Sequence, residues 1–285
     1  MRARTDQSEQ VVFTRVAADL PFDMLRARYV RQEFVPHAHD EYAVGVVEAG
    51  IGRIRHPNGD EEHPASSLIV IPAGMVHTGE AAAAEGWSYR MLYLPPAYLE
   101  RAAERAGLPV NTAPWFDKTS FTDPELAARL VTIHIELEHP DLCRAALQQV
   151  DDLLVEVVRR HATPRVVSGK PDGASTIAVR AVRAFLDQAF AKPVTVNNMA
   201  RVAHLSPHHL IRAFRRTFGL PPYMYVEQLR VQRARQLIES GTPIATAAVA
   251  AEFSDQSHLT RRSKRTLGIT PGVFARRVRG KAIRA

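Results

Sequence analysis

The chain has 285 residues, of which 46% are hydrophobic and 24% charged, so it is long enough for two domains with separate cores. Its single cysteine, Cys143, excludes an intramolecular disulfide framework and is typical of a reducing compartment. Because the sequence has no signal peptide and no apolar run of about 18 residues, we expect a cytoplasmic protein with no membrane partner.

Charge is divided unequally along the chain. Residues 176–285 contain 19 Lys and Arg against 5 Asp and Glu, a balance of +14, whereas residues 1–175 contain 18 against 25, a balance of −7. A basic region joined to an acidic one indicates phosphate binding with a strong salt dependence. The alternative is that the basic residues form a solvated helix face. This would explain their presence but not the difference in charge between the two parts of the chain.

The first predicted domain covers residues 1–162. Short apolar runs from about residue 11 to 95, separated by Gly, Pro and Asn58-Gly59, predict an antiparallel β-fold with a hairpin turn. The segments Pro36–Tyr42 and Ile71–His77 resemble the two sequence motifs of a cupin barrel. This resemblance implies a cupin-like β-barrel that binds a small-molecule effector. The candidate effector-binding residues lie in these two segments: His37, His39, Glu41, Tyr42 and His77.

The same motifs bear on metal binding. The resemblance implies the metal ligands of metal-binding cupins, which are two histidines, a glutamate four residues after the second and a final histidine. His37, His39 and His77 match the histidines, but the glutamate position falls on Ala43. Three imidazoles could still hold a divalent ion with an open site. Since the carboxylate is missing, and no nucleophile, acid pair or phosphate loop is present, we expect neither a cofactor nor an enzyme. A metal remains the alternative.

Two helices are predicted at about residues 123–161, the first opened by Pro124 and the second by Asp141. A near-heptad stripe on the second helix either packs on the barrel or forms a homodimer contact. The stripe consists of Leu142, Ala146, Gln149, Leu153 and Val157. Residues 163–175 contain Pro or Gly at four positions and are predicted to be a linker.

The remaining domain, residues 176–285, contains an internal repeat: Leu210–Gly219 aligns with Leu259–Gly268 at an offset of 49 residues. Apolar and small residues at helical spacing precede each copy, which predicts helix-turn-helix units at about 194–217 and 243–266. Ser206 before Pro207 is predicted to cap the second helix of the first unit, and Ser254 that of the second. The turns place His204 and Glu252 where a left-handed backbone is expected.

The segment Ala250–Pro271 resembles the C-terminal signature of AraC/XylS transcription regulators. The resemblance covers roughly the last 100 residues and implies an all-α domain in which a long helix, about Tyr223–Glu239, joins the two units. The family has Gly where Glu252 stands and an aromatic residue where Ser263 stands. We therefore expect an apolar notch under the second recognition helix.

The resemblance also implies the DNA-contacting positions. Base-reading positions fall on His208, Ile211, Arg212, Gln256, Ser257, Thr260 and Arg261, and Pro207 and Asp255 lie at the starts of the two helices. Arginine can pair with guanine and glutamine with adenine. The remaining basic residues are predicted phosphate anchors: Arg215, Arg216, Lys264 and Arg265.

These observations predict an α+β multidomain protein: a cupin-like barrel with two following helices, then an all-α DNA-binding domain. We expect a homodimeric transcription regulator that binds double-stranded promoter DNA, responds to a small-molecule effector and contacts RNA polymerase if it is an activator. Two alternatives remain open. One is a cupin metalloenzyme with a DNA-binding tail, and the other is an effector-independent DNA binder.

Overall fold

The computed structural model divides the chain into two compact units, the first mainly within residues 1–33 and 38–167 and the second within Phe34–His37 and Ser168–Val278. It describes residues 9–14, 22–109, 112–139, 141–166, 174–189 and 194–278. Among the helices of these ranges, none combines the length and apolar character needed to cross a membrane.

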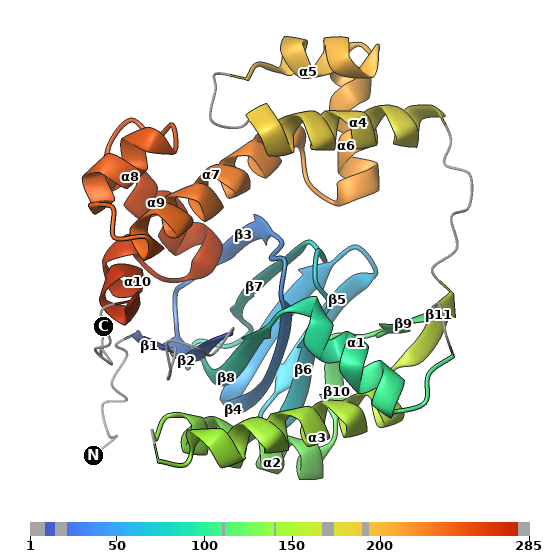
Figure 1. Cartoon of the computed structure of the whole chain (residues 1–285), viewed down its shortest axis with the longest axis vertical. Helices are drawn as coiled ribbons and strands as arrows, with labels where there is room; N and C mark the ends of the chain where they lie inside the picture. Colours follow the sequence, from blue (N-terminus) through green and yellow to red (C-terminus); the bar gives the residue numbers. More distant parts are fainter. Residues whose placement is uncertain are drawn as a thin grey trace. The chain divides into compact units, whose positions relative to one another are not determined.

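The first unit is built on a nine-stranded sheet (Figure 1). Its main path runs in the order β1-β2-β8-β4-β6-β10, while β5 and β7 pair with β4, and β3 pairs with β7. The strands are β1 (Gln10–Thr14), β2 (Asp23–Tyr29), β3 (Phe34–His37), β4 (Tyr42–His56), β5 (Gly59–Pro64), β6 (Ser67–Ile71), β7 (His77–Ala81), β8 (Trp87–Leu94) and β10 (Ser120–Thr122). The predicted antiparallel β-fold is confirmed.

Strand β4 joins two parts of this sheet. Up to Gly50 it pairs with β8 and β6, and from Ile51 onward it pairs with β5 and β7. The predicted hairpin is present between β4 and β5, but its two loop residues are Pro57 and Asn58, because His56 pairs directly with Gly59. Because β4 is shared, the strands β8 and β6 and the strands β5 and β7 belong to one continuous sheet.

Three helices accompany the sheet: α1 (Pro96–Arg105), α2 (Pro124–Leu137) and α3 (Cys143–His161). Helices α2 and α3 lie side by side, and α2 contacts β4 and β6 (Figure 1). Pro124 opens α2 as predicted, and the carboxylate of Asp123 caps it by accepting the N–H of Leu126 at 3.1 Å. Helix α3 begins at Cys143, two residues after the predicted Asp141.

The stripe on α3 belongs mainly to the core of this chain. Ala146, Leu153 and Val157 have 0% exposure and pack within the main apolar cluster of the sheet unit. Gln149 is exposed and donates to Glu136, and Leu142 is 48% exposed. The stripe as a whole is therefore not available as a dimer seam, because three of its five members are already buried.

The predicted linker is shorter than residues 163–175. Thr163–Val166 forms strand β11, which pairs antiparallel with β9 (Thr112–Trp115), and helix α4 begins at Ala174. Pro164 is accommodated because a two-stranded ribbon has outer edges where a missing N–H costs no ladder hydrogen bond. The guanidinium of Arg165 lies 4.1 Å from the ring centre of Trp115. Residues 167–173 of the predicted linker lie outside the described residues.

The second unit consists of helices. They are α4 (Ala174–Ala189), α5 (Val196–Ala203), α6 (Pro207–Phe218), α7 (Pro222–Glu239), α8 (Ile244–Ala250), α9 (Gln256–Leu267) and α10 (Pro271–Val278). The pairs α5–α6 and α8–α9 are the two predicted helix-turn-helix units, and α7 is the predicted long helix between them (Figure 1). His204 (φ 51°) and Glu252 (φ 63°) are left-handed, as the position of the turns predicted.

Candidate functional site

The two recognition helices each bury one face. Leu210, Ala213 and Phe214 of α6 are buried, and so are Leu259 and Ser263 of α9, which correspond to Leu210 and Phe214. Because the apolar side is used for packing, the polar side of each helix faces solvent.

The exposed faces contain nearly all the predicted DNA-contacting residues. On α6 these are Pro207, His208, Arg212, Arg215 and Arg216, and on α9 and its cap they are Asp255, Gln256, Ser257, Arg261, Lys264 and Arg265. Ile211 and Thr260 are half-buried. The hydroxyl of Thr260 donates to the carbonyl of Gln256 at 2.8 Å, so its methyl group is the part left for an apolar contact. Each helix therefore presents several cations and a few short polar side chains on one surface.

The cap of the second recognition helix differs from the prediction. Asp255, not Ser254, is the N-cap of α9: its carboxylate accepts the N–H of His258 at 2.7 Å. Ser254 supports it by donating to the Asp255 carboxylate at 3.2 Å. The hydrogen bond from the His258 backbone lowers the pKa of Asp255. Ser206 caps α6 as predicted, by accepting the N–H of His209 at 3.3 Å.

The notch expected at Ser263 is present. Ser263 lies against a small, mainly apolar cavity of about 10 Å³, which it shares with residues of α7, α9 and α10. At the equivalent position of the first unit, the ring of Phe214 fills the space and lies 4.6 Å from the ring of Phe218. The second unit thus has less aromatic packing beneath its recognition helix.

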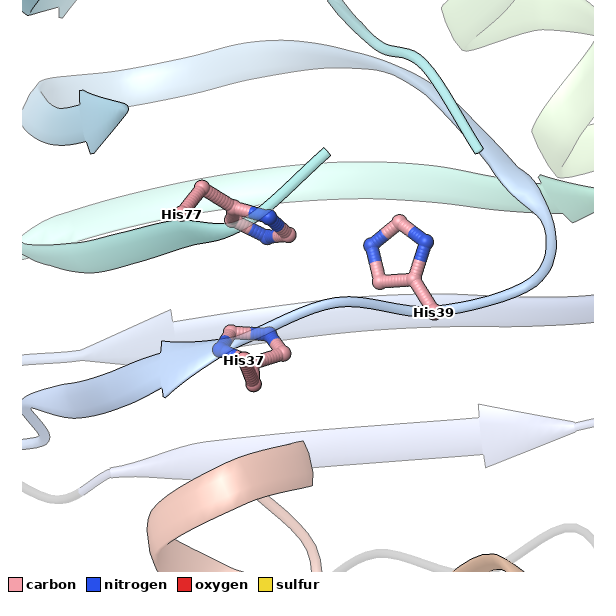
Figure 2. Close-up of side chains that lie close together, drawn as sticks. All are labelled: His37, His39 and His77. Atoms are coloured by element: carbon pink, nitrogen blue, oxygen red, sulfur yellow. The ribbon is translucent and has the colours of Figure 1, made fainter. Parts of the chain in front are cut away.

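In the sheet unit, three of the predicted effector-binding residues come together. His37, His39 and His77 each have a ring nitrogen, and these nitrogens lie within 4.8 Å of one another (Figure 2). The rings of His39 and His77 meet edge to face at 5.1 Å, and His39 also meets Tyr93 at 5.5 Å. His37 and His77 are buried and His39 is half-buried.

Backbone carbonyls orient all three imidazoles. The Nδ1 atoms of His37, His39 and His77 lie 2.8, 2.7 and 2.9 Å from the carbonyl oxygens of Val35, Glu41 and Met75. A carbonyl can only accept, so each Nδ1 donates. This orientation of the rings fits a divalent metal, since ligating histidines usually donate their other N–H in this way.

The other two predicted effector-binding residues, Glu41 and Tyr42, are not members of the histidine cluster. Glu41 contributes its backbone carbonyl to the orientation of His39. Tyr42 packs against the main apolar cluster, where burial, together with the charge of Glu100, raises the pKa of its hydroxyl. Ala43, at the motif's glutamate position, is 1% exposed. The histidine cluster therefore receives no carboxylate from that position.

A second polar group, not predicted from the sequence, lies inside the sheet unit. His63 is fully buried, its Nε2 lies 3.2 Å from the hydroxyl of Thr119, and burial lowers its pKa to about 4. Although burial opposes its ionisation, Glu61 has a lowered pKa because Thr119 donates to it from both N–H and hydroxyl. Within the described residues, His63 Nδ1 and the indole N–H of Trp87 are buried without a hydrogen-bond partner.

This group could have been found from strand alternation. Glu61 and His63 are two residues apart on β5 and pair with Ile54 and Gly52 of β4. Residues two apart share one face of a sheet, so both side chains point to the same side as the buried Ile54.

Comparison with protein families matched both units. A family described as an AraC-like ligand binding domain matches residues 19–161, and a helix-turn-helix domain family matches residues 199–277. The first match covers just over half of the chain.

Curated relatives are transcription regulators. The chain is 28% identical over 243 residues to an uncharacterized HTH-type transcriptional regulator, YbfI, of Bacillus subtilis, which covers 84% of this chain and 86% of that protein. It is 31% identical over 150 residues to a putative AraC-like transcription regulator of Streptomyces antibioticus, covering 51% and 50% of the two chains.

Solved structures of ToxT from Vibrio cholerae share the fold. One matches with a TM-score of 0.52 at 12% identity and covers 96% of this chain and 98% of ToxT. Another, with an unsaturated fatty acid bound, matches with a TM-score of 0.53 at 13% identity and covers 97% of each chain.

Proposed function

Because the chain belongs to the AraC family of transcription regulators, with a ligand-binding domain and a helix-turn-helix DNA-binding domain, we propose that it reads one promoter sequence under the control of a small-molecule effector. The observation that supports this most is the repetition of one surface: α6 and α9 each bury an apolar face and expose a cationic one at equivalent positions of two tandem units.

The exposed residues divide into two roles by chemistry. Arg212 and Arg261 are suited to pair with guanine, and Gln256 with adenine, each contributing about 1–3 kcal/mol of discrimination. The half-buried Ile211 and Thr260 offer methyl groups to thymine. His208 and Ser257, at the exposed starts of the two helices, complete the base-reading set. The remaining exposed cations anchor phosphates and set the position of the helices: Arg215, Arg216, Lys264 and Arg265.

The effector is proposed to bind inside the sheet unit. The side chains available to it are the imidazoles of His37, His39 and His77 at one place and the buried polar atoms of His63 and Trp87 at another. Buried polar groups without partners cost free energy, and a ligand that pairs with them recovers it. The fatty acid seen in ToxT belongs to that protein, and the chemistry of this chain's interior favours a more polar ligand.

A homodimer and RNA polymerase complete the proposed partners, the polymerase if the protein activates transcription. The dimer contact is proposed at the exposed Ile135 and Leu142, which lie near the junction of α2 and α3 and are 41% and 48% exposed. Light scattering of wild-type protein and Leu142→Glu checks this: the wild type is expected to have twice the monomer mass and the variant the monomer mass. The proposed role is regulation, not catalysis.

A promoter reporter tests the function. The DNA upstream of the protein's own coding region is fused to a reporter and expressed with wild-type protein, with the double variant Arg212→Ala/Arg261→Ala, or with Arg144→Ala, an exposed arginine of α3. Wild type and Arg144→Ala are expected to change expression, in either direction, and the double variant to have no effect. Equal expression in all three, and without the protein, would contradict the proposal for this promoter.

A further inference from the structure

The second recognition helix is joined to α7 by an ion pair that the first recognition helix cannot form at the equivalent position. Arg262 of α9 corresponds to Ala213 of α6 at the offset of 49 residues. The Nε atom of Arg262 lies 2.5 Å from Oε1 of Glu227, a residue of α7. Ala213 is 1% exposed and offers only a methyl group. Helix α9 is therefore attached to α7 by a charged contact (Figure 1).

The carboxylate of Glu227 depends on this arginine. Its Oε1 atom is buried and has no hydrogen-bond partner among the described residues, so the charge of Arg262 is what compensates it. A buried carboxylate oxygen without compensation is costly. The side chain of Arg262 is 39% exposed and that of Glu227 is 27% exposed. The pair therefore favours one orientation of Arg262, in which its guanidinium is directed toward α7.

The ion pair and the cavity beside Ser263 lie on one face of α7. Glu227 and Val231 are four residues apart and share that face, and Val231 lines the cavity. Ser263, which follows Arg262, leaves this contact without the ring that Phe214 supplies in the first unit. The contact between α7 and α9 thus lacks aromatic packing at Ser263, and the ion pair reinforces it one turn of α7 away.

We propose that Glu227 and Arg262 are positioning residues for base reading by the second unit. Their ion pair fixes the rotation of α9 on α7, and with it the direction in which Gln256 and Arg261 meet the bases. Neither member of the pair touches DNA. Pairing of glutamine or arginine with a base depends on direction, so a helix that rotates loses discrimination before it loses phosphate contacts. This inference rests on the proposed function, because it concerns how α9 reads its part of the promoter.

The alternative is that Arg262 is a phosphate anchor whose charge is weakened by Glu227. The two interpretations predict opposite effects of Glu227→Gln. If Arg262 is an anchor, the substitution frees its charge, and affinity for every DNA rises. If the pair positions α9, affinity for the upstream DNA falls and affinity for scrambled DNA stays unchanged.

Fluorescence anisotropy of the full-length protein on its upstream DNA and on scrambled DNA tests the proposal. The variants are Glu227→Gln, Arg262→Gln and the two combined. Each single substitution is expected to weaken binding to the upstream DNA by about 10-fold, and the double variant by no more than either, because both residues act through one contact. In Arg262→Gln the slope of log affinity against log salt should equal that of the wild type, whereas loss of a phosphate anchor lowers it by about 1.

Base substitutions across the upstream DNA locate the loss. Positions that matter to the wild type but not to Arg261→Ala define the half-site read by α9. Glu227→Gln and Arg262→Gln should lose selectivity at this half-site and retain it elsewhere, whereas partial unfolding would weaken both half-sites. The matched control is Glu239→Gln, which removes an equal charge from the C-terminal end of α7 and is expected to bind as the wild type. Circular dichroism verifies that each variant is folded.

Three results would overturn the proposal and leave the regulatory function standing. They are wild-type selectivity in both single variants, stronger binding of Glu227→Gln to both DNAs, and equal losses at the two half-sites. A wild-type protein without preference for the upstream DNA would contradict the proposed function, and this inference with it.

Discussion

Ser206 and Asp255 occupy equivalent positions of the two helix-turn-helix units, 49 residues apart, and cap their recognition helices in the same way. Each side chain accepts the backbone N–H three residues later, from His209 at 3.3 Å and from His258 at 2.7 Å. The repeat therefore extends to the local hydrogen bonding that starts each DNA-facing helix, although one cap is a hydroxyl and the other a carboxylate.

Removing a cap is expected to destabilise its unit. Ser206→Ala should lower the free energy of unfolding by about 1 kcal/mol, because the N–H of His209 loses its acceptor. Asp255→Ala should lower the unfolding midpoint, whereas Asp255→Ser should retain most of the stability because a hydroxyl serves at Ser206. Urea titrations monitored by circular dichroism measure these changes. Equal midpoints for Asp255→Ala and Asp255→Ser would show that the carboxylate does not act as the cap.

The two units are expected to respond differently to truncation beneath their recognition helices. Phe214→Ala should cost about 3–5 kcal/mol, since it removes a fully buried ring packed on Phe218 and Tyr225. Ser263→Ala should cost no more than about 1 kcal/mol, because the serine side chain is small and already leaves a cavity beside it. Chemical unfolding of both variants gives the comparison. Similar costs at the two positions would contradict the unequal anchoring.

Base reading and phosphate anchoring can be separated at neighbouring arginines of α6. Arg212→Ala should weaken binding to the promoter by about 1–3 kcal/mol and leave binding to random DNA almost unchanged. Arg215→Ala should weaken both and reduce the slope of log affinity against log salt by about 1. Fluorescence anisotropy at several salt concentrations measures both effects. Equal losses on the two DNAs for Arg212→Ala would assign that residue to phosphate contact.

His63 should make the stability of the protein depend on pH. Burial lowers its pKa to about 4 in the folded chain from an ordinary value of 6.5. Between these values the unfolded chain binds the additional proton, so the free energy of unfolding should fall as pH is lowered from 6.5 to 4, by on the order of 3 kcal/mol. Above pH 6.5 this contribution is fully present.

The matched variant is His63→Gln, which keeps a polar group near the hydroxyl of Thr119 but does not titrate. Urea unfolding at intervals of pH should show a smaller slope for the variant in this window. Carboxylates with lowered pKa values, among them Glu61, Glu138 and Asp255, titrate at more acidic pH and are common to both proteins. A wild-type slope equal to that of the variant would mean that His63 is not responsible.

Much of the second unit could be predicted because its sequence repeats. The offset of 49 residues located both recognition helices, and the left-handed turns at His204 and Glu252 followed from their positions. The same offset, applied four residues before the start of the repeat at Leu210, leads from Ser206 to Asp255. The prediction of Ser254 was wrong by one residue, and aspartate caps a helix as readily as serine does.

The sheet unit was less predictable because its contacts join distant segments. The two motifs located His37, His39 and His77, but nothing in the sequence indicates that backbone carbonyls fix all three rings. Strand β11 was hidden by Pro164 and its partner β9 is about 50 residues away. Whether the stripe on α3 faced the core or a second chain depended on packing that periodicity does not specify.

The central claim, that this chain reads a particular DNA sequence, is tested most directly by a gel-shift titration of the full-length protein. DNA from upstream of its own coding region is compared with a scrambled sequence of the same composition at about 150 mM salt, where purely electrostatic binding is weak. We predict affinity for the upstream DNA at least about 10³-fold above that for the scrambled DNA. Equal affinity for the two would contradict sequence-specific regulation of this promoter.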